Sequence, residues 1–179
     1  MERQADKLDR PRGIRNPAGF TMVELLAVII IIGILVAIVT SVASRAMRKS
    51  AEQRTKVTMR VIMDALEVYR EEFGVYPRFN VGNDYKKGNA QLYSLLCGDS
   101  SWGTEERFKL AKRRARDRLR ALPPDAISDQ GGNRYLVDGF DNVMWYHPSG
   151  GAGGGAYLES AGADNKFEEE EDNLRSDRL

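Results

Sequence analysis

The chain has few of the side chains that most often carry catalysis or bind transition metals. It contains one cysteine, Cys97, and one histidine, His147, among 179 residues. One cysteine excludes an internal disulfide, and a zinc site of the usual type needs several His or Cys ligands. The sequence also has no nucleophile–base motif, phosphate-binding loop or dinucleotide fingerprint. We therefore expect a protein that is not an enzyme, with Cys97 as a small buried apolar side chain rather than a reactive thiol.

Charged residues are abundant overall but nearly missing from one stretch. Residues 19–39 form an almost unbroken apolar run, GFTMVELLAVIIIIGILVAIV, with one carboxylate. From residue 20 to residue 43 a helix would be about 36 Å long, and the apolar core of a bilayer is about 30 Å thick. The apolar region of a secretory signal peptide is shorter, so a retained membrane anchor is favoured. The remaining residues leave room for one soluble domain of about 130 residues.

The carboxylate in this run belongs to Glu24. A charged side chain near the start of a membrane span is costly and usually functional. No Lys, Arg or His lies within the run, so we expect the partner of Glu24 to come from a new chain terminus or from another molecule. The alternative is a simple single-span anchor in which Glu24 reaches the membrane surface.

The residues around the start of the run carry a family resemblance. A modestly basic leader, residues 1–19, ends in Gly19 and is followed by Phe20, Thr21, Met22, Val23 and Glu24. This arrangement resembles the class III signal of type IV pilins and type II secretion pseudopilins. The resemblance implies that prepilin peptidase cuts between Gly19 and Phe20 and methylates Phe20 as the new N-terminus. It also implies that Glu24 pairs with the Phe20 amine of a neighbouring subunit and so sets the register between subunits.

The resemblance implies a pilin-like α+β fold. A long N-terminal helix would span the membrane with its first half and pack on a small antiparallel C-terminal sheet. The expected parts are the leader at 1–19, a transmembrane helix at 20–43, its periplasmic continuation at 44–76 and a globular α+β head at 77–179. Residues 41–72 contain no Pro or Gly, and an apolar stripe supports continued helix before Gly74 and Pro77. Ser41 stands where many family members have a proline that kinks the helix.

The head is expected to contain two further helices and three strands. We predict a loop at 78–90, a short helix at 90–97 and a helix at 104–122 with Thr104 as its N-cap. Strands are predicted at 133–137 and 142–147, as a hairpin around 138–141, with a third strand at 156–159. The side chains expected to pack on the long helix are Tyr135, Val137, Val143, Trp145 and Tyr157. A ligand-binding platform of these aromatic residues is the alternative interpretation.

The helix at 104–122 is strongly basic and permits two interpretations. Its cationic side chains are Arg107, Lys109, Lys112, Arg113, Arg114, Arg116, Arg118 and Arg120. They would suit DNA, an anionic polymer or an acidic partner. Long basic side chains also commonly cover the apolar surface of an ordinary solvated helix. We favour the solvated helix, and nucleic acid is not an expected partner.

The C-terminal segment SAGADNKFEEEED, residues 160–172, resembles the calcium loop of major pseudopilins. The match includes Ser160, Ala161, Gly162 and Asp164, with Asn165 where glycine is usual and an acidic cluster following. Calcium prefers six to eight oxygen ligands in a flexible geometry. The implied ligands are Leu158, Ser160, Asp164, Glu171 and Asp172. The alternative is a solvated acidic tail, and residues 173–179 are expected to be frayed.

Together these features resemble the major pseudopilin of a type II secretion system. The implied function is a structural subunit of a periplasmic pseudopilus, anchored in the inner membrane by a single pass with its C-terminal domain in the periplasm. The implied partners are prepilin peptidase, identical subunits in a helical fibre, minor pseudopilins and the inner-membrane secretion platform. The alternatives are a type IV pilin or DNA-uptake pilin subunit and a monomeric membrane-anchored binding module.

Overall fold

The longest element is helix α1, Met22–Phe73, in a computed structural model that describes residues 20–98, 100, 102–168 and 172–179. The helix ends where the sequence predicts. Gly74 takes the left-handed conformation, with φ of 74°, and its N–H donates to the carbonyl of Arg70 at 2.8 Å. Glycine adopts this conformation without the steric penalty that other residues pay, so it is a common helix terminator.

The chain divides into two compact units, residues 1–42 and 43–179, which we call the N-terminal and C-terminal units. The described part of the N-terminal unit is helix, and all of its side chains are exposed. The C-terminal unit holds the hydrophobic core. Within it, the second half of α1 packs on small antiparallel sheets, and two further helices complete a pilin-like α+β fold, as predicted.

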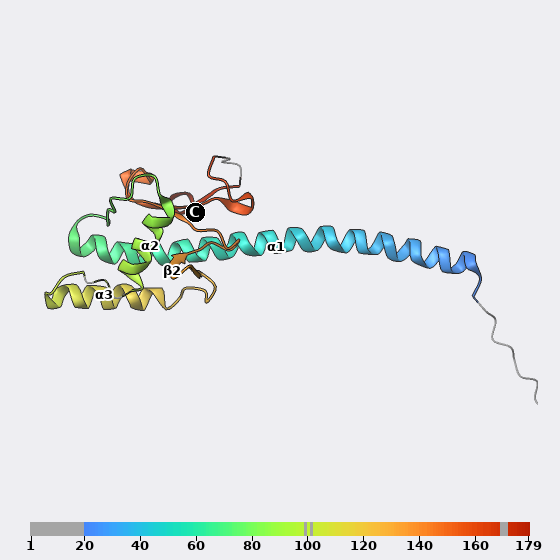
Figure 1. Cartoon of the computed structure of the whole chain (residues 1–179), viewed down its shortest axis with the longest axis horizontal. Coiled ribbons are helices and arrows are strands. Elements are labelled where there is room, and N and C mark those ends of the chain that lie inside the picture. The colour runs from blue at the N-terminus through green and yellow to red at the C-terminus, as the bar shows by residue number, and fades with distance from the viewer. Residues whose placement is uncertain (1–19, 99, 101, 169–171) are drawn as a thin grey trace, which may run out of the picture. The chain divides into compact units, whose positions relative to one another are not determined.

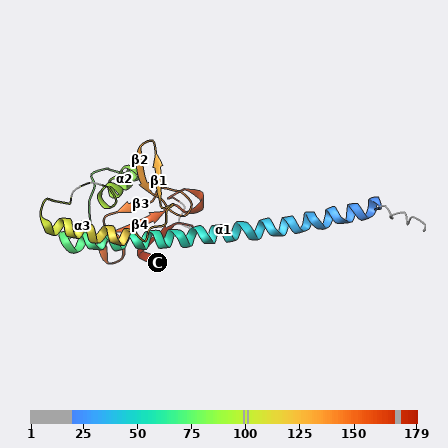
Figure 2. The same ribbon diagram turned by 90° about the horizontal axis from the view of Figure 1, so that it is seen from below.

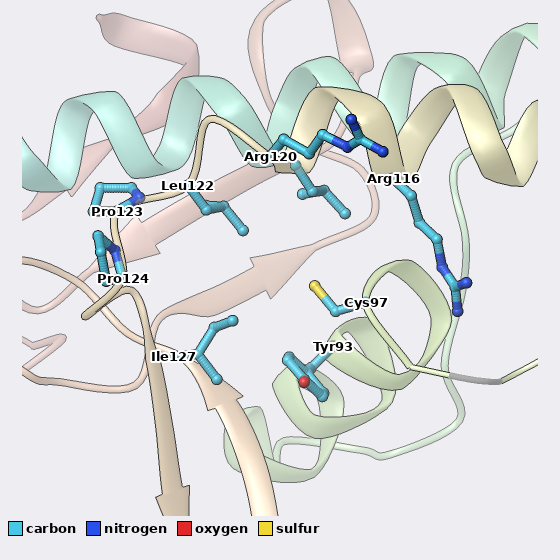
Figure 3. A pocket seen from close by; sticks show the side chains of 9 residues that line it. Tyr93, Cys97, Arg116, Arg120, Leu122, Pro123, Pro124 and Ile127 are labelled. Carbon is cyan, nitrogen blue, oxygen red and sulfur yellow. The ribbon is translucent and has the colours of Figure 1, made fainter.

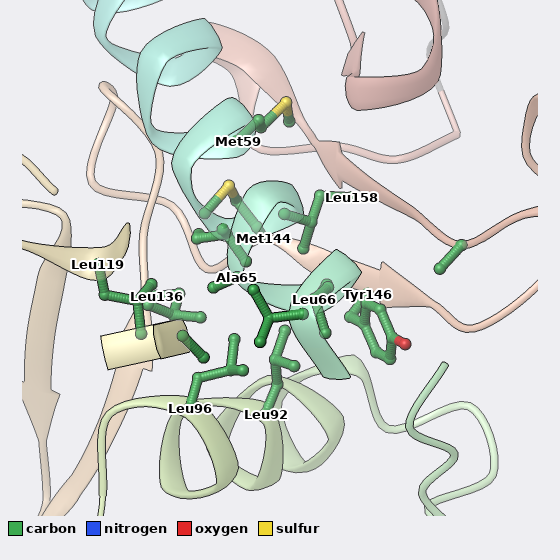
Figure 4. Close-up of a cluster of buried hydrophobic side chains, with 14 of the residues drawn as sticks. Met59, Ala65, Leu66, Leu92, Leu96, Leu119, Leu136, Met144, Tyr146 and Leu158 are labelled. Atoms are coloured by element: carbon green, nitrogen blue, oxygen red, sulfur yellow. The ribbon is translucent and has the colours of Figure 1, made fainter. Parts of the chain in front are cut away.

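The core lies along one face of the second half of α1. Met59, Ile62 and Leu66 are fully buried at helical spacing. Figure 4 shows Met59 and Leu66 among buried side chains that include Leu92 and Leu96 of α2, Leu119 of α3, Leu136 of β2 and Leu158 of β4. Ile62 and Leu66 belong to the predicted stripe. Tyr69 and Phe73, the other two members, are half-buried and pack at the edge of the core.

Helix α2, Tyr85–Leu96, begins earlier than predicted. Residues 85–90 were expected to belong to a loop because they contain Gly88 and Asn89. Asp84 instead caps the helix, since its carboxylate accepts the N–H of Lys87 at 3.0 Å. The cap and tertiary packing outweigh the weak helix propensity of the two residues.

Helix α3, Glu106–Leu119, lies alongside the C-terminal part of α1, as Figures 1 and 2 show. The rings of Phe108 and Phe73 stack with centroids 4.8 Å apart, and Arg114 pairs with Glu71 at 2.9 Å. The predicted helix is confirmed, but Thr104 is not its N-cap. Glu105 occupies that position without a side-chain hydrogen bond.

The strands form two separate sheets. β1, Ile127–Gln130, and β2, Asn133–Leu136, make an antiparallel hairpin around Gly131 and Gly132, both with positive φ. The second sheet has the order β3-β4-β5 and is antiparallel, with β3 at Trp145–His147, β4 at Tyr157–Ser160 and β5 at Leu174–Arg175. Strands β1 and β5 were not predicted. The expectation of a frayed end at 173–179 was wrong, because β5 and a 3-10 turn at Ser176–Arg178 lie there.

The predicted hairpin between 133–137 and 142–147 is present only as a short antiparallel pairing. One bridge, Val137 to Val143, joins these segments, with the Asp138 N–H donating to the Asn142 carbonyl at 2.9 Å and the Met144 N–H to the Leu136 carbonyl at 3.2 Å. The buried side chain of Asn89 adds hydrogen bonds to both segments. The Asn89 amide of α2 donates to the carbonyls of Leu136 and Met144 at 2.9 and 2.8 Å and accepts the N–H of Leu136 at 2.7 Å. One amide side chain therefore joins the end of the first sheet to the start of the second.

The carboxylate of Asp138 stabilises the turn at 138–141, which separates the segments 133–137 and 142–147. Its carboxylate accepts the N–H groups of Phe140 and Asn142 at 2.8 and 2.9 Å and the hydroxyl of Ser160 at 2.5 Å. Burial, only partly offset by these hydrogen bonds, raises the pKa of Asp138 above its usual value. The turn also docks on α1, since Gly139 donates its N–H to the hydroxyl of Thr55 at 2.9 Å.

The break at 138–141 shifts which strand residues face the core. Val137 and Val143 are buried, as predicted, but Tyr135, Trp145 and Tyr157 are half-buried. In these segments and in β4, the buried side chains are instead those of Leu136, Met144, Tyr146 and Leu158. A shift of one residue moves every strand side chain to the opposite face. The predicted inward face was therefore wrong at Tyr135, Trp145 and Tyr157.

Candidate functional site

Glu24 and Thr21 form a reciprocal capping box at the start of α1. The Glu24 carboxylate accepts the backbone N–H of Thr21 at 2.8 Å and its hydroxyl at 2.9 Å. The Thr21 hydroxyl accepts the N–H of Glu24 at 3.2 Å. The pattern Thr-x-x-Glu before an apolar run is the sequence signature of this arrangement. Sequence reasoning overlooked that signature and expected the partner of Glu24 only at a new terminus or on another molecule.

The capping box satisfies hydrogen bonds but does not neutralise the charge of Glu24. Both partners of the carboxylate are groups of Thr21, which is uncharged. Phe20, the residue expected to become the new N-terminus, precedes Thr21 and is 81 % exposed. Phe20 lies just outside α1, four positions before Glu24 along the chain, while Gly19 lies outside the described residues.

The helix that follows presents an apolar surface on every side. From Leu25 to Val42 the large apolar side chains are between 44 and 64 % exposed. By length and composition, this part of α1 is suited to cross a membrane. An exposed apolar surface of this size needs lipid or other helices as its surroundings.

The C-terminal loop, residues 160–172, is tied to the core at its first residue. Ser160 is fully buried, donates its hydroxyl to Asp138 and accepts the N–H of Gly162 at 3.1 Å. Gly162 has φ of 68°, and Asn165 has φ of 58°. Asn165 thus adopts a conformation that favours glycine, and asparagine tolerates it better than most residues.

Two carboxylates of this loop, Asp164 and Asp172, accept hydrogen bonds from backbone N–H groups. Asp172 accepts the N–H of Ala163 at 2.9 Å and lies 3.5 Å from the Arg48 guanidinium, while Asp164 accepts the N–H of Lys166 at 3.0 Å. Glu171, a further predicted ligand, lies outside the described residues. Among the residues that the structure describes, no three His, Cys, Asp or Glu side chains are grouped to hold a metal ion.

A pocket of about 410 Å³ lies between α2, α3 and β1 and has an apolar floor (Figure 3). Tyr93 and Cys97 project toward it from α2, and Arg116 and Arg120 lie at its α3 side. Burial raises the pKa of the Cys97 thiol to about 11. The thiol is therefore protonated at neutral pH and is a poor nucleophile, as the sequence predicts, although Cys97 is half-buried rather than buried.

The basic residues of α3 are extensively paired. Arg107 contacts Glu72 at 3.5 Å, and Arg120 contacts Asp117 at 3.3 Å. Lys109 likewise pairs with Glu106 at 2.6 Å. These pairs are solvent-exposed and reduce the net charge of the face. The helix nevertheless remains basic overall, and its interpretation as a solvated helix stays a prediction.

Comparison with protein families identifies the segment that contains the capping box. Residues 14–40 match the family model described as the prokaryotic N-terminal methylation motif. The match supports a type IV pilin-like protein, and the motif implies processing by prepilin peptidase and pilin-like assembly. Comparisons with curated proteins and with solved structures found no significant match.

Proposed function

We propose that this chain is the precursor of a structural subunit of a pseudopilus that supports type II protein secretion. The observation that carries the proposal is the methylation motif at residues 14–40, with Glu24 at the start of an exposed apolar helix. The C-terminal loop with its Ser-Ala-Gly-x-Asp sequence supports the pseudopilin subtype.

Processing would prepare the chain for assembly. Hydrolysis of the Gly19–Phe20 peptide bond leaves a carboxylate on Gly19 and an ammonium group on Phe20, which is then methylated. In a bundle of apolar helices, the Glu24 carboxylate of one subunit would pair with the Phe20 ammonium of its neighbour. Both charges are costly to bury alone, and their pairing offsets part of that cost. The pair would thereby fix the axial register of identical subunits.

The membrane anchor determines where the precursor would lie and which partners it would meet. The N-terminal unit would hold the precursor in the inner membrane by a single pass, with the C-terminal unit in the periplasm. Minor pseudopilins and the inner-membrane secretion platform would be its further partners. Growth of the fibre would then help to move folded proteins through an outer-membrane channel.

Deletion of the gene tests this role directly. We expect the deletion strain to retain folded exoproteins in its periplasm and to regain secretion when the wild-type chain is supplied. Twitching motility and DNA uptake should be unchanged, since these depend on true type IV pili. Normal secretion combined with loss of motility or DNA uptake would contradict the proposal.

Calcium is the cofactor that we propose for the C-terminal loop. The donor set suits a hard cation in kind: carboxylates from Asp164, Glu171 and Asp172 with oxygens from Leu158 and Ser160. The ion would supply positive charge that holds the acidic loop closed against its own repulsion. Asp164 and Asp172 already close parts of this loop through backbone N–H groups. The Arg48 guanidinium lies 3.5 Å from Asp172 and already places one positive charge next to this carboxylate.

Thermal unfolding of residues 43–179 with calcium and with a chelator measures this contribution. Calcium at about 100 times its dissociation constant should add about 2.7 kcal/mol to the free energy of unfolding, which raises the melting temperature by several degrees. Asp164→Ala should abolish the shift. Asp129→Ala, which removes an exposed carboxylate from β1, should retain it. Equal melting curves in calcium and chelator would reduce the loop to a polar tail.

A further inference from the structure

The residues that directly follow the membrane-spanning segment form a basic surface on α1. Residues 44–56 contain five basic residues against one acidic residue, whereas the whole chain has a net charge of +1. Arg45, Arg48 and Lys49 are separated by three and four positions and so lie on one face of the helix. We call these three residues the juxtamembrane basic face. All three are exposed.

Much of the charge on this face is uncompensated. Arg48 lies 3.4 Å from Glu52 and 3.5 Å from Asp172. Arg45 and Lys49 make no ion pair with any of the residues that the structure describes. The basic residues of α3 differ, because several of them already have acidic partners.

Apolar groups lie on the side of α1 opposite Arg45 and Lys49, next to Arg48 at the edge of the basic face. Met47 is 73 % exposed, although methionine is usually buried. Met47 and Phe140 line a pocket of about 450 Å³ together with Arg48 and Arg54. Exposed apolar side chains next to basic ones are typical of protein surfaces that lie at the boundary between lipid headgroups and acyl chains.

The position along the chain identifies the partner. Arg45 follows Val42, the end of the N-terminal unit, by three residues, and Lys49 follows it by seven. In a helix these separations are about 4.5 Å and 10.5 Å. The headgroup layer on each side of the bilayer core is roughly 5–8 Å thick. The backbone of Arg45 therefore falls within the headgroup layer when the span is inserted. The backbone of Arg48 and Lys49 lies just beyond that layer, and their long side chains can reach back to the headgroups.

We propose that the juxtamembrane basic face binds the phosphate groups of anionic phospholipids in the membrane that anchors α1. Arg45, Arg48 and Lys49 supply the positive charge of this site. The interaction holds the precursor in the membrane before assembly, and a subunit that enters a fibre must give it up. The proposal rests on membrane insertion of α1 and does not require polymerisation.

Native mass spectrometry of the full chain in detergent tests the proposal. The protein is incubated with equal amounts of phosphatidylglycerol and phosphatidylcholine, and the ratio of the two bound lipids is measured. A basic residue near an anionic surface contributes roughly a fivefold preference, so three give an upper limit on the order of 100-fold. We expect the wild-type chain to prefer phosphatidylglycerol at least tenfold. The combined variant Arg45→Gln, Arg48→Gln and Lys49→Gln should bind the two lipids to within about twofold of equality.

A matched variant controls for net charge. Arg113→Gln, Arg114→Gln and Arg118→Gln together remove three positive charges from the exposed side of α3 and should leave the preference unchanged. Bound phosphatidylcholine reports that the span still holds lipid in each variant. An unchanged ratio in the juxtamembrane variant, or an equal loss in the α3 variant, would overturn the proposal. Glu24→Gln should retain the lipid preference, so a failure of assembly is distinguishable from a failure of lipid binding.

Discussion

Replacement of Glu24 by glutamine is expected to give a processed, membrane-bound chain that does not assemble into fibres. Glutamine at this position still accepts the N–H of Thr21, because the capping box tolerates Glu or Gln. The helix start is therefore kept and only the negative charge is lost. The Phe20 ammonium of a neighbouring subunit would then be buried without a counter-charge, which costs about 3–5 kcal/mol. Each subunit addition would weaken by a factor on the order of 100 to 1,000 or more.

The measurement is the amount of fibre recovered from cells that express the secretion apparatus, seen by electron microscopy and immunoblotting. Thr21→Val is the matched control for the capping box. It removes the hydroxyl that donates to the Glu24 carboxylate and accepts the Glu24 N–H. The lost cap should cost about 1 kcal/mol in helix stability, but the Glu24 carboxylate is kept. We expect this variant to assemble.

Gly19→Leu separates processing from assembly. This variant should remain at precursor size, whereas the Glu24 and Thr21 variants should lose the leader. Fibres at wild-type level from Glu24→Gln would contradict the role of the charge. Loss of fibres from Thr21→Val with the leader removed would show that assembly depends on the capped helix start instead.

The sequence predicted α1 well because its signals are local and long. An apolar run, the absence of Pro and Gly over residues 41–72 and Gly74 at the end all act within the helix itself. Glu24 could be singled out from the sequence alone, since a lone carboxylate in an apolar run is costly to bury. Its role in assembly stays a prediction. Its hydrogen bonds to Thr21 were predictable too, from the spacing of three residues.

The sheets were predicted poorly because their pairing depends on distant residues. The segments before and after the turn at 138–141 pair with each other through one bridge only. Leu136 and Met144 also bond to Asn89, which is 47 and 55 residues away along the chain. Strand β5 has two residues, too few for any sequence pattern, and exists because Ser160 and Glu159 of β4 offer it a partner edge. Such interactions become visible only when the fold is known.

Asn89 is expected to be the most sensitive polar residue of the C-terminal unit. Its side chain is fully buried and makes three hydrogen bonds to the backbone of Leu136 and Met144. Asn89→Ala would leave the Leu136 N–H and the Met144 carbonyl without this partner in a dry core. Each unsatisfied group costs about 1–3 kcal/mol, so we expect a loss of roughly 3–5 kcal/mol in the free energy of unfolding. That is a large fraction of the 5–15 kcal/mol that typically stabilises a domain.

Urea denaturation of residues 43–179 measures this loss. Asn89→Asp should be at least as harmful as Asn89→Ala, because a carboxylate cannot donate and would face the carbonyls of Leu136 and Met144. Asn133→Ala, an exposed position in β2, is the matched control and should change stability by less than about 0.5 kcal/mol.

The local effect of Asn89 can be separated from the global one by amide hydrogen exchange. The Leu136 N–H, which donates to the Asn89 side chain, should exchange faster in Asn89→Ala than global destabilisation alone explains. The Val137 N–H, which donates to the carbonyl of Ala126 at 2.9 Å, should follow the global change. A loss below about 1 kcal/mol with an unchanged Leu136 exchange rate would mean that the bond from the Met144 N–H to the Leu136 carbonyl, at 3.2 Å, is enough to join the two sheets.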